Sequence, residues 1–306
     1  MNMAESLNLG RALRGERKHN EPMARHVSWR AGGVAKQFYK PADLADLQAF
    51  LHTLPPAEEI LFVGLGSNLL VRDGGFTGTV VLTTPMLSGL ALDPNDANVV
   101  VAGAGVASPH VAKFAARNHL AGAEWLAGVP GTVGGALAMN AGCYGTEAWD
   151  QVEHCTTLDR TGLLHARHRD DFEIGYRHVA PKPAREEWFV SAHFRFVPGE
   201  AGTAQARIKE LLAKRMASQP LDKPNAGSTF RNPVGDHAAR LIESCGLKGF
   251  AIGGAQVSVK HANFIVNTGT ATAAEIEALI AHMQKTVRDN TGVELVREVK
   301  IVGMNK

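Results

Sequence analysis

Hydrophobic and polar positions in the first part of the chain alternate between strand-like and helix-like patterns. Apolar residues recur at helical spacing from Leu44 to Leu51, directly after Asp43, a residue type that favours a helix start. Ser108 and Pro109 predict the start of a second helix, because a capping residue is followed by proline in the first turn. Short apolar runs predict strands at residues 60–63, 79–82 and 99–102. Strands and helices are therefore interleaved here.

The pattern changes further along the chain. Residues 152–198 are rich in strand-forming side chains and end at a break formed by Pro198 and Gly199. Beyond the break, one face of a predicted helix carries Ile208, Leu211, Leu212 and Met216. A capping box of Thr272 and Glu275 starts another helix, with an apolar face of Ile276, Leu279, Ile280, Met283 and Val287. Alternation near the C-terminus predicts a last strand that contains Glu294, Val296 and Glu298 on one face.

These patterns predict an α+β protein of more than one unit, as the length of 306 residues also favours. We expect an N-terminal extension at residues 1–20, a first unit at 21–199 and a second unit at 200–306. The chain contains no internal repeat and no low-complexity segment.

Charge and cysteine content exclude several classes of protein. Lys and Arg total 32 against 30 for Asp and Glu, so no overall field favours nucleic acid or a membrane surface. Cys143, Cys155 and Cys245 are odd in number and widely spaced, which argues against a disulfide framework or a zinc site. We see neither a signal peptide nor a stretch long enough to insert in a membrane. A cytoplasmic location is expected, with no obligate protein partner evident.

The first candidate ligand site is a loop that follows the predicted strand at 60–63. It contains, in order, Gly64, Leu65, Gly66, Ser67 and Asn68. Glycines after a buried strand let backbone N–H groups approach a phosphate closely. The third glycine of the dinucleotide fingerprint is missing, because Leu69 occupies its place. A tight turn without ligand is the alternative.

A second glycine-rich loop spans residues 128–142. Its candidate cofactor contacts are Gly131, Thr132, Gly134, Gly135, Asn140 and Gly142. Such a loop leading into a helix offers free amides to a pyrophosphate, and its small side chains leave room for a flat ring. Close backbone packing is the alternative. Two phosphate-type loops imply a dinucleotide, and the absence of the Rossmann and P-loop motifs favours FAD on another scaffold.

Several ordered motifs now resemble the UDP-N-acetylenolpyruvoylglucosamine reductases. The similar segments are 26–33, 64–73, 122–131, 139–142, 176–177, 225–233, 253–254, 261–264 and 298–299, which cover nearly the whole chain after residue 20. The resemblance implies a vanillyl-alcohol-oxidase-like FAD-binding unit at 21–199, with two subdomains at about 21–85 and 86–199, and a UDP-sugar-binding domain at 200–306. It also implies NADPH as the hydride donor, and the length is typical of the shorter family form, which lacks a tyrosine-bearing loop.

The resemblance assigns three catalytic residues. Arg177 matches the family's catalytic arginine, whose planar fork suits a carboxylate. Ser228 matches the residue that donates a proton, although the sequence alone does not separate it from Thr229. Glu298 matches the acid that stabilises the intermediate or organises the arginine, and Glu294 is its rival on the same predicted face.

Weaker matches concern the substrate. We expect contacts from Tyr176, Arg231, Asn232, His261 and Asn263, although each residue type alone is more often solvent-facing or locally bonded. No metal site is expected. Val179 and Cys143 depart from the serine and alanine usual in the family, which puts one substrate or arginine contact in doubt. The implied reaction is the NADPH-driven reduction of UDP-N-acetylglucosamine enolpyruvate to UDP-N-acetylmuramate, a cell-wall precursor. A flavin oxidase on the same scaffold and a non-enzymatic flavin-binding module are the alternatives.

Overall fold

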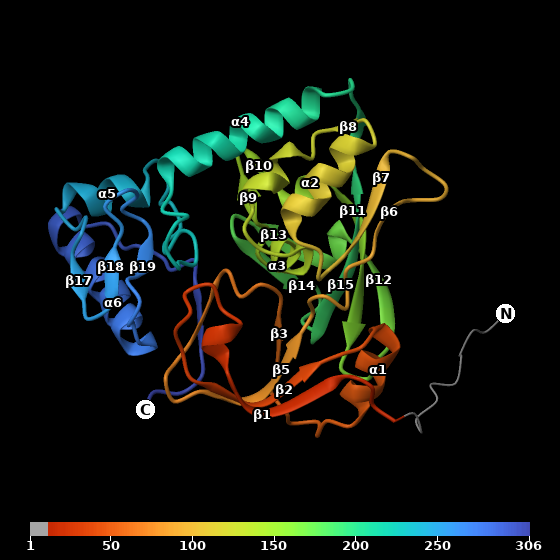
Figure 1. Cartoon of the computed structure of the whole chain (residues 1–306), viewed down its shortest axis with the longest axis horizontal. Coiled ribbons are helices and arrows are strands. Elements are labelled where there is room, and N and C mark those ends of the chain that lie inside the picture. The colour runs from red at the N-terminus through yellow and green to blue at the C-terminus, as the bar shows by residue number, and fades with distance from the viewer. Residues whose placement is uncertain (1–11) are drawn as a thin grey trace.

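A computed structural model describes residues 12–306. Its N-terminal unit is a four-stranded mixed sheet in the order β1-β2-β5-β3 (Figure 1). The bounds are β1 Glu16–Pro22, β2 Val34–Lys40, β3 Ile60–Val63 and β5 Phe76–Leu82. Helix α1 (Leu44–His52) begins as expected, because the Asp43 side chain accepts a hydrogen bond from the Asp46 amide at 2.9 Å. Its buried Leu47, Phe50 and Leu51 pack against this sheet.

The middle unit is a five-stranded antiparallel sheet in the order β12-β11-β15-β7-β6. Its strands are β6 Leu90–Leu92, β7 Val99–Gly103, β11 Val152–Asp159, β12 Leu164–His168 and β15 Glu187–Arg195. Helices α2 (Ser108–Arg117) and α3 (Val133–Met139) pack into its core. One hydrophobic cluster contains residues of both the N-terminal and the middle unit, among them Val81 from β5 and Leu158 from β11. The two sheets therefore share a buried interface.

The C-terminal unit combines three short strands with two helices. The strands are β17 Ala251–Ile252, β18 Ala255–Val257 and β19 Ile265–Asn267, and the helices are α5 Ala238–Ser244 and α6 Ala273–Thr291. The predicted capping box of Thr272 and Glu275 is present, and the predicted apolar face of α6 is buried. Trp29 from the N-terminal unit is fully buried in this core and donates from Nε1 to the Ile265 carbonyl at 2.8 Å. The α+β class is therefore confirmed.

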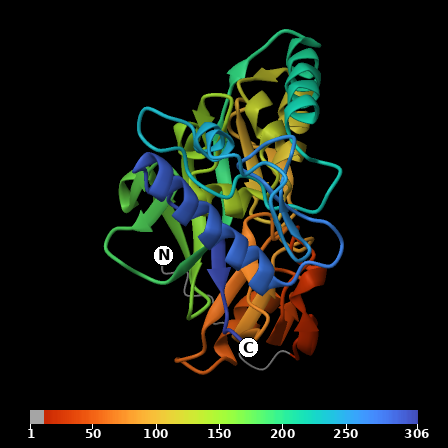
Figure 2. The ribbon, with the colours of Figure 1, turned by 90° about the vertical axis from the view of Figure 1, so that its left-hand side faces the viewer.

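Two elements connect the C-terminal unit to the rest. Helix α4 (Thr203–Ser218) runs from the middle unit to the C-terminal unit (Figure 1). The last strand, β20 (Lys300–Val302), returns to the N-terminal unit and pairs in parallel with β4 (Leu69–Val71), so the chain end lies beside that unit (Figure 2). The remaining short pairs are β8 Leu120–Ala121 with β16 Val197–Pro198, β9 Gly142–Cys143 with β10 Thr146–Glu147, and β13 Phe172–Gly175 with β14 His178–Pro181.

Three local predictions were wrong. Residues 293–299 form no regular strand, although Phe230 and Arg297 make one isolated antiparallel bridge. Met216 in the last turn of α4 is 59 % exposed, whereas Ile208 and Leu212 of the same helix pack against the middle unit. Ser108 lies inside the first turn of α2 rather than before it, and its buried hydroxyl has no hydrogen-bond partner. Since α4 packs on the middle unit yet follows residue 200, the domain division stays a proposal.

Candidate active site

A cavity of about 310 Å³ lies where all three units meet. Its walls come from β3, the two glycine loops, α3, α4 and the turn at Arg177, and from three segments that follow α4 in the chain, at 226–228, 264 and 298–300. The predicted residues among them are Gly64, Leu65, Gly66, Ser67, Asn68, Gly131, Thr132, Gly135, Gly142, Arg177, Ser228 and Glu298. Residues separated by more than 200 positions in the chain therefore share one site.

The two glycine loops pack directly against each other. A Cβ atom on Gly64 would lie 2.3 Å from Oγ1 of Thr132, and one on Gly131 would lie 3.0 Å from Oγ of Ser67. Gly66 adopts a positive φ of 60°, and a Cβ there would lie 2.1 Å from the His26 carbonyl oxygen. Protein packing alone therefore requires Gly64 and Gly66 to be glycine.

Other glycines on the cavity wall have no such packing reason. Gly135 lies within α3, and a Cβ there would meet nothing nearer than Thr132 Oγ1 at 3.8 Å. Gly227 also lines the cavity, and a Cβ there would have no neighbour within 4 Å, but its positive φ of 74° by itself favours glycine. Because glycine inside a helix is unfavourable, Gly135 is explained by the open wall that it leaves for a ligand. This wall fits the flat ring of the cofactor that the resemblance implies.

Three predicted cofactor residues also serve the protein's own structure. The buried Asn140 has a left-handed φ of 44° and donates from Nδ2 to Glu147 Oε2 at 2.6 Å and to the Gly175 carbonyl at 3.1 Å. Gly134 packs against Ala104, whose Cβ would lie 3.0 Å from an added Cβ. Asn68 donates from Nδ2 to the Glu298 carbonyl at 3.0 Å. The Asn68 contact ties the first loop to the candidate catalytic segment.

Arg177 lies in the tight turn between β13 and β14 with a left-handed φ of 53°. Its Nε donates to Glu298 Oε1 at 3.0 Å, and its two terminal nitrogens donate to the carbonyls of Asn140 at 3.2 Å and Gly142 at 2.9 Å. Its guanidinium carbon lies 4.9 Å from the centre of the Tyr176 ring. A non-glycine residue in this backbone region is strained, so the surrounding contacts fix both the turn and the guanidinium.

The segments that carry Ser228 and Glu298 run side by side. The Glu298 amide donates to the Thr229 carbonyl at 2.9 Å, and the Arg231 amide donates to the Val296 carbonyl at 2.9 Å. Ser228 and Glu298 both line the cavity. Their sequence rivals do not, since Thr229 is fully buried with an unpartnered hydroxyl and Glu294 is exposed.

Burial and charge act in opposite directions on Glu298. Burial raises the pKa of its carboxyl above the usual value, while the charges of Arg177 and Arg231 and the hydrogen bond from Arg177 lower it, and burial is the larger effect. A raised pKa makes the protonated form more accessible near neutrality. The carboxyl can therefore either donate a hydrogen bond or pair with Arg177.

The five predicted substrate contacts do not line this cavity. Asn263 holds the backbone of Phe230 through both its amide oxygen and its amide nitrogen, at 3.0 and 2.8 Å. Asn232 accepts a hydrogen bond from the Ala238 amide at 3.1 Å, and His261 Nδ1 accepts one from the Asn263 amide at 3.3 Å. Arg231 has a buried Nε without a partner, and the Tyr176 side chain is exposed. These contacts remain predictions.

The sequence patterns missed Arg215 and Gln219 from α4 and its end, together with Phe264 and Lys300. Arg215 follows Ile208, Leu211 and Leu212 at helical spacing and so lies on the same face of α4, but its charge gives no sign in the sequence that this face borders a cavity. Cys143 also lines the cavity, and burial raises the pKa of its thiol, which keeps the thiol protonated. Cys143, where alanine is usual in the similar sequences, therefore adds a small neutral side chain to the cavity wall.

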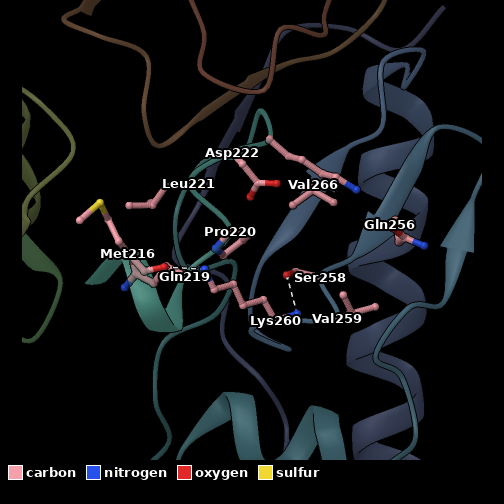
Figure 3. A pocket seen from close by; sticks show the side chains of 11 residues that line it. Met216, Gln219, Pro220, Leu221, Asp222, Gln256, Ser258, Val259, Lys260 and Val266 are labelled. Atoms are coloured by element: carbon pink, nitrogen blue, oxygen red, sulfur yellow. Dashed lines mark hydrogen bonds between the residues drawn. The ribbon is translucent and has the colours of Figure 1, made fainter. Parts of the chain in front are cut away.

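A second cavity, of about 510 Å³, adjoins the first at Gln219, which lines both. Figure 3 shows its walls, which come from the end of α4, from the segment 219–223 and from the strands of the C-terminal unit. The Lys260 amide donates to Ser258 Oγ at 3.1 Å, and Lys260 Nζ donates to the Met216 carbonyl.

Within residues 12–306, no helix combines the length and apolar character needed to cross a bilayer.

Comparisons with known proteins assign the family. Residues 35–166 match the model of an FAD binding domain, and residues 219–302 match that of the UDP-N-acetylenolpyruvoylglucosamine reductase C-terminal domain. A UDP-N-acetylenolpyruvoylglucosamine reductase of Thiobacillus denitrificans is 56 % identical over 95 % of this chain and 93 % of its own length. One from Legionella pneumophila, strain Philadelphia 1, is 53 % identical over 93 % of this chain and 91 % of its own. The solved reductase structure from Thermus caldophilus is 29 % identical with a TM-score of 0.77, covering 95 % of this chain and 99 % of that one. The chain belongs to the UDP-N-acetylenolpyruvoylglucosamine reductase family.

Proposed function

We propose that this chain reduces the enolpyruvyl group of UDP-N-acetylglucosamine enolpyruvate to give UDP-N-acetylmuramate, with bound FAD and with NADPH as reductant. The observation that carries the proposal is the pairing of Arg177 with Glu298 on a cavity that Ser228 and both glycine loops also line. FAD reduced by NADPH supplies the hydride. The cavity wall at Gly135 and the residues of the first glycine loop would hold the FAD.

The residues around Arg177 suit the charge that the reaction creates. When hydride adds to the terminal carbon of the enol ether, negative charge develops on the carbon next to the carboxylate. The Arg177 guanidinium, fixed by Glu298 and two backbone carbonyls, would stabilise this charge through hydrogen bonds to the substrate carboxylate. Glu298, with its raised pKa, would add a hydrogen bond in its protonated form.

Ser228 would complete the reduction by giving its hydroxyl proton to that carbon. A serine hydroxyl is a weak acid, so positioning and the nearby arginine must ease the loss of the proton. Thr229 is the natural control, because its adjacent hydroxyl is buried away from the cavity. We further propose that the reaction takes place in the cytoplasm, where NADPH and the UDP-sugar are available, and that residues 200–306 bind the UDP-sugar.

The test separates the two half-reactions. Anaerobic NADPH should bleach the yellow flavoprotein, and UDP-N-acetylglucosamine enolpyruvate should restore its absorption. Ser228→Ala should be bleached at the normal rate but reoxidised at least about 100-fold more slowly, whereas Thr229→Val should behave like the wild type. Unchanged reoxidation in Ser228→Ala would reject Ser228 as proton donor.

Steady-state kinetics test the order of the reaction. We expect parallel double-reciprocal lines, because NADPH and the UDP-sugar must approach the same reacting position in turn. Intersecting lines would contradict this order. If oxygen reoxidised the flavin while a sugar was oxidised, the protein would instead be an oxidase. If NADPH failed to bleach the bound flavin, the protein would be a flavin-binding module without this activity.

A further inference from the structure

Arg177 has a second carboxylate partner, Glu147 of β10, which does not line the cavity. Glu147 Oε1 lies 3.5 Å from Arg177 Nη1, and Glu147 Oε2 accepts the hydrogen bond from Asn140 Nδ2 at 2.6 Å. Glu298 contacts a different nitrogen of the same guanidinium, Nε, and does line the cavity. The guanidinium is therefore held by one carboxylate on the cavity wall and by another outside that wall.

The backbone around Glu147 allows this close approach. Glu147 pairs with Gly142 across the hairpin of β9 and β10. A Cβ on Gly142 would lie 2.8 Å from the Thr146 carbonyl oxygen, 2.9 Å from Glu147 Cγ and 3.1 Å from Arg177 Nη1. A larger residue at Gly142 would thus displace the hairpin and the ion pair together. Asn140 and Arg177, on either side of Glu147, both have left-handed backbone conformations, which cost energy unless their surroundings hold them.

Glu147 changes the charge that a substrate carboxylate meets at Arg177. If Glu147 and Glu298 were both ionised, the substrate would bring a third carboxylate to one guanidinium. The Glu147 side chain is 32 % exposed, whereas that of Glu298 is 17 % exposed and burial raises the pKa of its carboxyl. Of the two glutamates, Glu298 is therefore the one that takes up a proton more easily.

The other ionisable groups around the pair leave this balance to Glu147. Asp150 accepts a hydrogen bond from the Glu147 amide at 2.8 Å, on the exposed side of the hairpin. Burial raises the pKa of the Cys143 thiol, so the thiol stays neutral. Arg231 acts on Glu298 together with Arg177, and both favour the ionised carboxylate.

We propose that Glu147 is a positioning residue for the reaction, because it is the permanent counter-ion of Arg177 and thereby lets Glu298 stay protonated when the substrate carboxylate binds. This inference rests on the proposed function. With Glu298 neutral, the two arginines that act on it are balanced by Glu147 and by the substrate carboxylate. A protonated carboxyl can donate a hydrogen bond to the developing charge, which an ionised carboxylate cannot do.

The first test compares the half-reactions of Glu147→Gln across pH. Glutamine keeps the size of the side chain and an oxygen for Asn140, but it removes the charge. Arg177 would then pair with Glu298 alone, so Glu298 should lose its proton at lower pH. Reoxidation of the NADPH-reduced variant by the substrate should be about 10-fold slower than in the wild type at pH 8 and within about twofold at pH 6. Bleaching by NADPH should be normal at both values.

Two matched variants show whether charge is the cause. Glu147→Asp keeps the charge, so it should keep the wild-type pH dependence, with rates within about threefold. Glu173→Gln removes a carboxylate from β13, four residues before Arg177, where the Glu173 side chain is 66 % exposed. This control should stay within about twofold of the wild type in both half-reactions at every pH.

The proton on Glu298 can also be followed without turnover. Carbon-13 spectra of glutamate-labelled holoenzyme would give its titration midpoint, with the signal assigned by its absence from Glu298→Gln. The midpoint should move to lower pH in Glu147→Gln and stay unchanged in Glu147→Asp and Glu173→Gln. An unchanged midpoint in Glu147→Gln would overturn the inference. So would a shifted midpoint in Glu147→Asp, which keeps the test open if the glutamine variant does not fold.

Stability and binding exclude a merely structural role. Glu147→Gln should retain FAD and melt within about 3 °C of the wild type, because a partly exposed ion pair contributes little. At pH 6 its oxidised form should bind UDP-N-acetylglucosamine enolpyruvate with equal or higher affinity, since one anion near the substrate carboxylate is gone. Loss of FAD, or weaker binding and slower reoxidation by the same factor at every pH, would show that Glu147 only maintains the structure.

The proposed function fails separately from this inference. If the wild-type holoenzyme did not reduce UDP-N-acetylglucosamine enolpyruvate, but the Glu298 midpoint still depended on the charge of Glu147, the activity would be refuted and the control of the Glu298 proton by Glu147 would stand. Normal turnover with a midpoint independent of Glu147 would give the reverse result.

Discussion

Gly135→Ala should stabilise the protein without FAD and weaken its binding of FAD. Gly135 lies inside α3, and its Cβ position is open, with Thr132 Oγ1 the nearest atom at 3.8 Å. Replacing glycine by alanine at a compatible helical position typically adds about 0.4–1 kcal/mol to the free energy of unfolding, because it restricts the unfolded chain. In a protein of this size the gain corresponds to a rise of about 1–3 °C in the melting temperature.

The same methyl group would project into the cavity. Overpacking a well-fitted contact costs about 1–3 kcal/mol, which corresponds to about 5–150-fold weaker FAD binding. Gly64→Ala provides the contrast, since its Cβ would lie 2.3 Å from Thr132 Oγ1 in the protein itself. That variant should be destabilised with or without FAD.

Thermal unfolding of the flavin-free proteins and fluorescence titration with FAD measure the two effects. The expected pattern is a higher melting temperature with weaker FAD binding for Gly135→Ala, and a lower melting temperature for Gly64→Ala. If Gly135→Ala bound FAD with unchanged affinity, the open wall of α3 would not contact the cofactor. A lower melting temperature in that variant would show that Gly135 is needed for packing.

Three other predictions follow from groups with unusual surroundings. Because burial raises the pKa of Glu298, its contribution to stability is present below the unfolded pKa and is lost as pH rises through the higher folded value. Glu298→Gln should therefore flatten the fall in unfolding free energy as pH rises above the ordinary range of a glutamate. Thr229→Val removes a buried hydroxyl without a partner, so the free energy of unfolding in urea should stay unchanged or rise by up to about 1 kcal/mol. A loss larger than about 1 kcal/mol would show that the hydroxyl makes a hydrogen bond. Burial, assisted by the charge of His154, lowers the pKa of His193, so stability should be lost as pH falls below about 6.5, and His193→Phe should reduce this acid sensitivity in melting curves.

Local sequence signals predicted the elements whose burial follows from their own pattern. The capping box at Thr272 and the apolar face of α6 are present because one helix contributes both the cap and the buried stripe. The segment 293–299 shows the limit of such signals. Leu295 and Val299 are buried while Val296 is exposed, so the segment alternates in part, although Arg297 is exposed as well. Alternation does not determine whether a partner strand is in hydrogen-bonding reach, and here only one isolated bridge forms.

The choice between neighbouring candidates depended on tertiary structure in the same way. Ser228 and Thr229 have similar chemistry, and both suit a turn, so only their position relative to the cavity separates them. Arg215 was missed for a related reason. Helical periodicity places Arg215 on the face of α4 that carries Ile208 and Leu211, but it does not show that the last turn of this face borders a cavity.

The convergence of the site itself follows from one long-range strand pair. Parallel pairing of β20 with β4 sets Lys300 opposite Leu69, directly after the first glycine loop. The Lys300 amide then donates to the Asn68 carbonyl at 3.0 Å, and Asn68 Nδ2 donates to the Glu298 carbonyl at 3.0 Å. Glu298 is thereby held beside the loop and within reach of Arg177. A pairing across about 230 residues leaves no local pattern in either segment, so the motifs identify the residues, while only the fold explains why they meet.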